Sequence, residues 1–466
     1  MQDYAYSSAL HLREAILSKA VSPVEVMKEC LTRLEAVEPL LNCFVTRTPD
    51  LAMDAARSAE RALMAGEPVG LLHGLPISVK DLISVGGVRQ TFGSRSMASN
   101  IAKTDAPAVG RIKQAGACIV GTTTTSEFGC KAVGDSPLTG VTRNPWNTEC
   151  TPGGSSCGAA ASVAAGVTPF ALGTDGGGSI REPAALTGLF GIKAQFGRVP
   201  VFPASATPTL AHVGPLARTV RDAALLLSAI AGQDGRDPFS VAAPVPAWLQ
   251  ACDLPVKGMR LAWSPTLGYA KPDQEVLSLC ESAVRVFEKL GCEIVELPEG
   301  IGPDPDQLWM AEFYAGVGTR LNGTLSESRE ILDPAVASLL DKALDQSLLE
   351  YYTKVFARYE FRERIRAMFE SFDLLLTPTA PVPAFPVNVD VPPQFAGRNP
   401  CTWQYYTYPF NLTGQPAASL PVGFTSAGLP VGLQLVSRIN AETDIFRAAS
   451  AFEMEHPWGN IRPPCL

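Results

Sequence analysis

The chain has 466 residues, enough for two or three average domains or for one large α/β enzyme. Hydrophobic residues make up 46% and charged residues 18%, a composition typical of a globular protein with a sizeable core and not of a disordered chain. The net charge of −8 and the absence of Lys/Arg-rich runs argue against a nucleic-acid-binding surface.

Neither a secretion signal nor a membrane span is predicted. The first residues lack a basic segment followed by an apolar one, and no stretch approaches 18 uninterrupted apolar residues. The 11 cysteines show no CxxC pairs and no zinc-ligand spacing. We therefore expect free thiols, no metal site, no cofactor and a cytoplasmic location.

Helical and strand patterns alternate along the first half of the chain. The first clear helix is predicted from a capping box between Ser22 and Glu25, followed by an apolar stripe of Val24, Met27, Leu31 and Leu34. Further elements are predicted in the order helix 51–65, strand 75–79, helix 105–115 and strand 118–120.

From residue 151 to residue 200 the composition shifts to Gly, Ala and Ser. This region predicts two Gly-rich loops, one before a helix at 156–165 and one after a strand at 170–172. A helix at about 220–230 and a strand–helix–strand unit at 259–297 follow, whereas residues 300–400 are expected to be less regular. Without repeats or linkers, this alternation predicts one large α/β domain.

The second Gly-rich segment could support acyl transfer. A row of backbone N–H groups from Gly176, Gly177 and Gly178 would form a concave donor site for an oxyanion, with the Ser179 hydroxyl beside it. The structural alternative is that these glycines only make a tight turn against a helix.

A serine nucleophile needs a base, and the chain has only four histidines. His11 and His456 lie near the termini, while His73 and His212 fall in predicted loops. Lys80 offers another route because it ends the apolar strand 75–79 and would be carried into the interior. Burial lowers the pKa of a lysine, so that its neutral form can accept a proton.

A second serine motif leads to a different enzyme class. Residues 154–158 match G-x-S-x-G, which would make Ser156 the nucleophile of an α/β-hydrolase-like esterase with His212 or His456 as base. That motif requires a strand directly before it, and residues 147–152 are predicted to be a loop.

Lys80, the Gly-Gly-Ser-Ser segment at 153–156 and the Gly-Gly-Ser-Ile-Arg segment at 177–181 together resemble the amidase signature family. Segments near 22–26, 214–220, 410–417 and 428–435 also look family-like. The resemblance therefore covers nearly the whole chain. It implies one domain over 1–466 with a mixed central β-sheet flanked by helices, a catalytic core at about 70–220 and a substrate pocket at about 300–410.

The resemblance also implies a catalytic mechanism. Ser179 would be the nucleophile that forms an acyl-enzyme. Ser155, expected to follow a cis peptide bond, would relay its proton, and Lys80 would be the final base. The N–H groups of residues 176–179 would line the oxyanion hole.

The resemblance also bears on other residues of the two segments. Asp175 and Arg181 would brace the second Gly-rich loop from behind. Cys157 and Glu182 depart from the residue types usual in the family, which bears on the shape of the pocket. Cys157 is more easily interpreted as a packed, inert thiol than as a reactive one.

The implied reaction is hydrolysis of a small carboxylic amide, with esters or carbamates as alternative substrates. No nucleic-acid or membrane partner is expected, and a homodimer is compatible with the sequence. Trp309 and Phe313, at helical spacing, would form either an apolar pocket wall or ordinary core. Two alternatives stay open: a glutamyl-tRNA amidotransferase A-type subunit that works with partner subunits, and a catalytically silent binding protein on the same fold.

Overall fold

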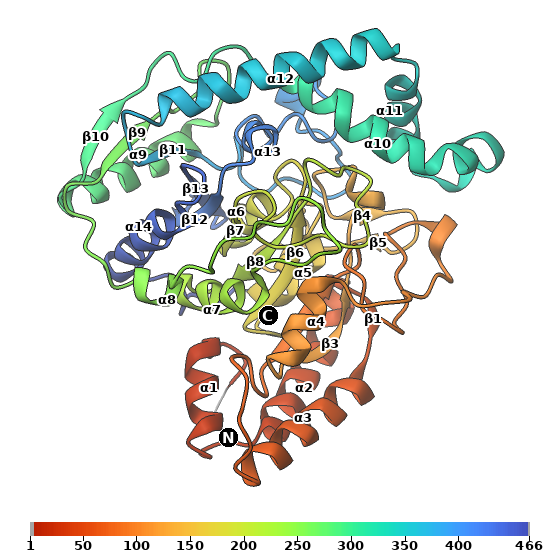
Figure 1. Cartoon of the computed structure of the whole chain (residues 1–466), viewed down its shortest axis with the longest axis vertical. Coiled ribbons are helices and arrows are strands. Elements are labelled where there is room, and N and C mark those ends of the chain that lie inside the picture. Colours follow the sequence, from red (N-terminus) through yellow and green to blue (C-terminus); the bar gives the residue numbers. More distant parts are fainter. Residues whose placement is uncertain (1–3, 465–466) are drawn as a thin grey trace.

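An eleven-stranded sheet runs through the computed structural model, which describes residues 4–464 (Figure 1). Its strands are β1 Phe44–Arg47, β2 Pro76–Lys80, β3 Cys118–Thr123, β6 Phe170–Asp175, β7 Phe190–Lys193, β8 His212–Ala217, β9 Arg260–Trp263, β10 Glu293–Glu296, β11 Leu374–Pro378, β12 Ala417–Phe424 and β13 Pro430–Ser437. Their order is β1-β3-β2-β6-β8-β7-β12-β13-β11-β9-β10. Pairing is parallel in β3-β2-β6 and β11-β9-β10 and antiparallel elsewhere, which confirms the predicted mixed sheet.

Helices cover both faces of the sheet because the central strands are apolar on both sides. On β6, Ala171 packs into the cluster formed with α5 Cys157–Ala164 and α6 Arg181–Thr187. Its neighbours Phe170 and Leu172 point to the opposite face. That face is covered by helices α4 Pro107–Gln114, α7 Val220–Ile230, α8 Trp248–Ala251, α9 Gln274–Lys289 and α14 Glu442–Glu455.

The two helices on either side of β1 are those that the sequence predicts. After α1 Ala9–Leu17, α2 Pro23–Leu41 begins at the expected capping box of Ser22 and Glu25, and α3 Pro49–Met64 follows β1. Met27 and Leu34 are buried as expected, while Val26 and Cys30 complete the stripe in place of the half-buried Val24 and Leu31.

The prediction of little regular structure over 300–400 is wrong. Three helices occupy most of it, α10 Asp306–Glu327, α11 Pro334–Leu344 and α12 Leu348–Met368. They form a layer above α13 Pro409–Thr413 (Figure 1). The helical period of α12 was missed because apolar residues occur on both its buried and its exposed side, so that no single stripe marks it.

The remaining elements are small. A two-stranded sheet of β4 Asp135–Ser136 and β5 Gly140–Val141 lies apart from the main sheet. The ten cysteines within residues 4–464 are free thiols, nine of them buried. In the same part of the chain, no helix combines the length and the apolar character that a membrane crossing requires.

Candidate active site

Lys80 is the last residue of β2 and lies where the parallel strands β2 and β6 end. β2 runs parallel to β6, with Ser78 beside Ala171, so Lys80 and Thr174 end at the same edge. Side chains alternate along a strand, and Lys80 therefore points to the same face as Ser78. The Ser78 hydroxyl is hydrogen bonded to Ser162 of α5, so Lys80 extends toward the N-terminus of that helix.

Burial changes the acid–base chemistry of Lys80. The side chain has no exposed surface, and its desolvation lowers the pKa from 10.5 to about 7. The negative charge of Asp175 opposes this shift without reversing it. Lys80 Nζ lies 2.7 Å from Ser155 Oγ, 2.8 Å from Thr174 Oγ1 and 3.0 Å from Ser156 Oγ. The lysine is thus held by three hydroxyls and is readily deprotonated near neutral pH.

Ser155 and Ser179 lie on two loops that are hydrogen bonded to each other. The expected cis peptide bond is present between Gly154 and Ser155. The Ser156 N–H donates to the Ser179 carbonyl at 3.2 Å. Ser155 is buried, whereas Ser179 is partly exposed, and no hydrogen bond engages its hydroxyl within residues 4–464. The structure therefore joins Lys80 to Ser155 directly and leaves the Ser179 hydroxyl free.

Two carbonyls of the second Gly-rich loop accept hydrogen bonds from side chains outside the loop. Trp309 Nε1–H donates to the Gly176 carbonyl at 2.8 Å, and the Thr407 hydroxyl donates to the Gly177 carbonyl at 2.6 Å. A Cβ on Gly177 would lie 2.7 Å from the Trp309 ring, and one on Gly176 would lie 3.0 Å from Phe313. Only glycine allows this approach, and both glycines are partly exposed.

Gly178 differs from its neighbours. Its N–H donates to Asp175 Oδ1 at 2.8 Å, and the N–H of Ile180 donates to the other carboxylate oxygen at 3.2 Å. The expectation that Gly178 offers a free donor is therefore wrong. Within the described residues, the N–H groups of Gly176, Gly177 and Ser179 are the ones of this loop without an acceptor.

A buried ion pair anchors the loop, as expected for Asp175 and Arg181. Arg181 donates twice to the carboxylate, with both nitrogens 2.9 Å from its oxygens, and both side chains are fully buried. Burial alone would raise the pKa of Asp175, but the Arg181 guanidinium holds it well below its ordinary value. Arg181 also donates to the Thr407 carbonyl and to the side chains of Gln434 and Asn411.

Glu182 connects the two Gly-rich segments. Its Oε2 accepts the Gly154 N–H at 2.8 Å, and its Oε1 has no hydrogen-bond partner in the described structure. Burial raises the pKa of this carboxyl well above its ordinary value, as does nearby Asp175, which favours the neutral acid. Gly153, at φ 81°, lies so close that a Cβ there would be 2.5 Å from Glu182 Oε2.

The rival catalytic groups are not placed for catalysis. Ser156 is fully buried, donates to the Thr174 carbonyl at 3.1 Å and follows no strand, so the α/β-hydrolase alternative is wrong. His212 lies on β8 with Nε2 at 3.3 Å from Lys193 Nζ and Nδ1 at 2.8 Å from the Leu210 carbonyl.

Several residues around these loops were missed by the sequence analysis. Thr174 contacts Lys80, and Thr407 and Gln434 reach Arg181 from 226 and 253 positions away. No local pattern marks such long-range partners. Among residues 4–464, no group of three or more His, Cys, Asp or Glu side chains is arranged to hold a metal ion.

Comparison with known proteins agrees with this fold. The family profile described as Amidase matches residues 25–446. An acylamidase of Rhodococcus erythropolis is 34% identical over 467 residues, covering 99% of this chain and 98% of that protein. The glutamyl-tRNA(Gln) amidotransferase A-type subunit of Moorella thermoacetica is 36% identical over 484 residues, covering 98% of each.

Solved structures give the same result. The backbone superposes on a bacterial aryl acylamidase of the amidase signature enzymes with a TM-score of 0.92 and 31% identity, covering 98% of both chains. The chain therefore belongs to the amidase family and is an amide-hydrolysing enzyme.

Replacing Arg181 by Met should destabilise the fold by about 3–5 kcal/mol because it leaves the Asp175 carboxylate buried without its cation. Urea unfolding measures this loss. The control is Arg221→Met, which breaks an exposed pair with Asp253 and should cost at most about 1 kcal/mol. Equal losses in the two variants would contradict a special role for the buried pair.

Glu182→Gln should keep kcat/KM within about threefold of the parent, since an amide oxygen can still accept the Gly154 N–H. Glu182→Leu removes the acceptor of a buried donor, which costs about 1–3 kcal/mol, and should lower kcat at least about tenfold with little change in KM. Steady-state kinetics with thermal unfolding checks both. Normal kcat in the folded Leu variant would refute the positioning of Gly154 by Glu182.

Proposed function

We propose that the chain is a stand-alone amidase that forms an acyl-enzyme on Ser179. The observation that carries the proposal is Lys80, a fully buried lysine with a pKa of about 7, hydrogen bonded to Ser155 beside the loop of Ser179. A group that titrates near the working pH is suited to general base catalysis. Retention of Lys80, Ser155 and Ser179 weighs against a catalytically silent binding protein.

The hydroxyls around Lys80 indicate the path of the proton. A neutral lysine has two N–H donors and one lone pair, so one of its three neighbours can give it a proton. The Ser156 proton is already donated to the Thr174 carbonyl. Ser155 then passes its proton to Lys80 and takes one from Ser179, whose hydroxyl is free to attack a carbonyl carbon. Lys80 later returns the proton to the leaving amine.

The oxyanion of the tetrahedral intermediate would be held by backbone donors. The N–H groups of Gly176, Gly177 and Ser179 have no acceptor in the described structure and flank the nucleophile. Anchoring of the loop carbonyls by Trp309 and Thr407 fixes these donors before the substrate binds. Preorganised donors of this kind stabilise developing charge without reorganisation during the reaction.

The likeness to acylamidases in sequence and backbone supports a substrate with an aryl or other apolar group on the amide. Esters and carbamates would form the same acyl-enzyme. The similarity to amidotransferase A-type subunits leaves one alternative open, in which the same residues are active only when partner subunits are bound. Activity of the isolated chain distinguishes the two.

The purified chain alone should hydrolyse an N-acyl anilide and should form one covalent adduct with a serine-reactive fluorophosphonate. Peptide mapping by mass spectrometry should place the adduct on Ser179. Ser179→Ala should give no adduct, and Lys80→Ala should slow turnover at least about 10³-fold through loss of the base. An adduct on Ser156 would overturn the mechanism. Labelling of Ser179 without turnover until the partner proteins are added would instead favour the amidotransferase role.

The rate constant for fluorophosphonate labelling should rise with pH and level off above about 7, because protonated Lys80 cannot accept the proton and the neutral form can. Labelling reactions that are quenched at successive times and analysed by intact mass give this rate constant at each pH. The slow residual labelling of Lys80→Ala should lack this step. A rate in the parent that is constant between about pH 6 and 8 would refute Lys80 as the base.

A further inference from the structure

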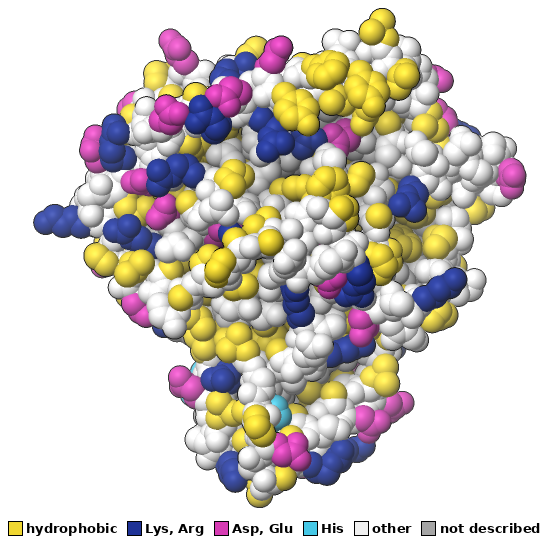
Figure 2. All heavy atoms as spheres, viewed as in Figure 1, with side chains coloured by type: hydrophobic (Ala, Val, Ile, Leu, Met, Phe, Trp, Pro, Cys, Tyr) yellow, Lys and Arg dark blue, Asp and Glu magenta, His cyan; other side chains and the backbone are white. Residues whose placement is uncertain are grey.

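The outer surface of α12 carries a row of exposed apolar side chains. Leu349, Tyr352, Phe356 and Tyr359, here called the α12 stripe, are 49–79% exposed. The ring centroids of Tyr352 and Phe356 are 6.2 Å apart, so these two rings lie side by side. Figure 2 shows hydrophobic side chains gathered over this part of α12, which lies at the outer edge of the fold (Figure 1). A patch of this kind commonly marks a binding surface.

The α12 stripe has the spacing of a helix–helix contact. Its members follow one another after three, four and three positions, which is the repeat along which two helices pack in a narrow seam. Glu350, Lys354 and Arg358, the charged residues between them in the chain, fall at other positions around the helix. The stripe is therefore suited to contact with a single further helix.

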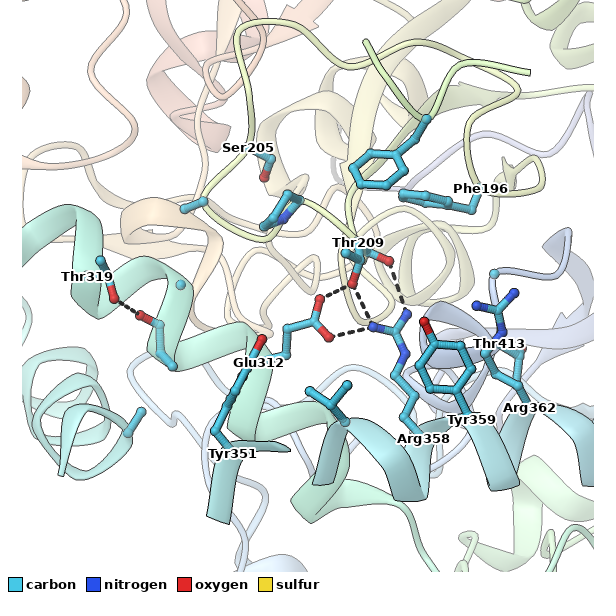
Figure 3. Close-up of a pocket in the computed structure, with 18 of the residues that line it drawn as sticks. Phe196, Ser205, Thr209, Glu312, Thr319, Tyr351, Arg358, Tyr359, Arg362 and Thr413 are labelled. Atoms are coloured by element: carbon cyan, nitrogen blue, oxygen red, sulfur yellow. Dashed lines mark hydrogen bonds and ion pairs between the residues drawn. The ribbon is translucent and has the colours of Figure 1, made fainter. Parts of the chain in front are cut away.

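The inner side of α12 is already engaged by the rest of the chain. Phe361 and Ile365 are buried in the apolar cluster beneath the helix. Arg358 pairs with Glu312 of α10 and donates to the Thr209 hydroxyl, as Figure 3 shows. These contacts fix the orientation of the helix about its own axis. The stripe is therefore held outward by the fold of a single chain and needs a partner to be buried.

A groove of about 1120 Å³ runs along one flank of the stripe, between α12, α10 and the loop of residues 195–209 (Figure 3). Four residues of α12 line it at helical spacing: Leu348, Tyr351, Val355 and Tyr359. Tyr359 thus belongs to both the groove and the stripe. Phe239 and Ile439, each 46% exposed, also line the groove. The exposed apolar surface therefore continues from the stripe into the groove.

The exposed apolar area is close to what a stable dimer buries. A large apolar side chain that becomes fully covered removes about 150–250 Å² from water. At 49–79% exposure, the stripe together with neighbouring Leu348 offers about 500–800 Å² per chain. Two copies packed stripe to stripe would bury about 1,000–1,600 Å², and specific protein interfaces bury about 1,200–2,000 Å². Contacts at the rim of the groove would add to this area.

An antiparallel arrangement of two α12 helices makes the stripe complementary to itself. A two-fold axis level with Lys354 places Leu349 against Tyr359 of the second copy, and Tyr352 against Phe356 of the second copy. Each contact occurs twice by symmetry, so the four residues of each chain form four apolar layers. Aromatic pairs and aromatic–aliphatic pairs of this kind pack well in a helix seam.

From these features we infer that the protein forms a two-fold homodimer through antiparallel packing of the α12 stripes. A lipid surface fits less well, because helices that lie on membranes carry a polar face rich in Lys and Arg. Here Glu360 and Glu363 lie next to the stripe, and the chain has a net charge of −8. The inference is independent of the reaction proposed for Lys80, Ser155 and Ser179, none of which belongs to this surface.

Sedimentation velocity of the full chain tests the inference. The parent should sediment as a dimer at about 10 µM, with a dissociation constant of about 1 µM or lower. The double variant Tyr352→Glu/Phe356→Glu should be monomeric, with a dissociation constant raised at least about 100-fold, because its carboxylates would be buried in the seam. The control Leu51→Glu/Met454→Glu changes exposed apolar residues of α3 and α14 and should stay dimeric. Circular dichroism verifies the fold of each variant.

Disulfide cross-linking tests the antiparallel register. An equimolar mixture of Tyr352→Cys and Phe356→Cys chains should form, on mild oxidation, linked dimers that contain one chain of each kind. Leu51→Cys should form none. Cross-links between like chains only would overturn the antiparallel dimer.

A parent that is monomeric at about 100 µM, or a folded double glutamate variant that is still dimeric, would overturn the inference outright. A monomer that binds lipid vesicles or a different protein through the stripe would equally exclude the second copy as its occupant.

Discussion

The buried ion pair between Asp175 and Arg181 is the interaction on which the site depends. Asp175 ends β6, and its carboxylate holds the N–H groups of Gly178 and Ile180, which sets the turn that presents Ser179. The Arg181 side chain, which comes from the same turn, also donates hydrogen bonds to Asn411 and Gln434, which lie far along the chain. One charge pair thereby fixes the loop of Ser179 and joins it to α13 and β13. Such a pair is stable in the interior only because every remaining donor is satisfied.

Segments outside the Gly-rich core also hold the second Gly-rich loop in place. Trp309 comes from α10 and Thr407 from the turn before α13, and each holds one carbonyl of the oxyanion loop. The region expected to form the substrate pocket therefore contacts the back of the loop as well. Changes in α10 would alter both the packing of the loop and the direction of its N–H groups.

The sequence indicated candidate residues of the site better than it predicted their geometry. Lys80 and Ser179 could be named as candidates because a strand end and a Gly-rich loop are local patterns, whereas the part of Ser155 came only from the resemblance to the amidase signature family. The bond of Gly178 to Asp175 could not be foreseen, since the direction of one N–H depends on a turn geometry that composition does not determine. Helix α12 was missed, and α10 was indicated only by the helical spacing of Trp309 and Phe313, for a related reason: tertiary packing supports both helices in place of a one-sided apolar stripe.

The burial of Lys80 has a consequence for the stability of the whole protein. In an unfolded chain this lysine binds a proton below pH 10.5, whereas the folded protein keeps it neutral down to about pH 7. Unfolding between these values therefore takes up a proton, and by linkage the free energy of unfolding contributed by this residue rises as the pH rises through that window. At neutral pH the same desolvation that makes Lys80 a base reduces the stability of the native state. The stability of the fold is thus opposed, at the single Lys80 Nζ atom, to the neutral form of the lysine that the proposed mechanism requires.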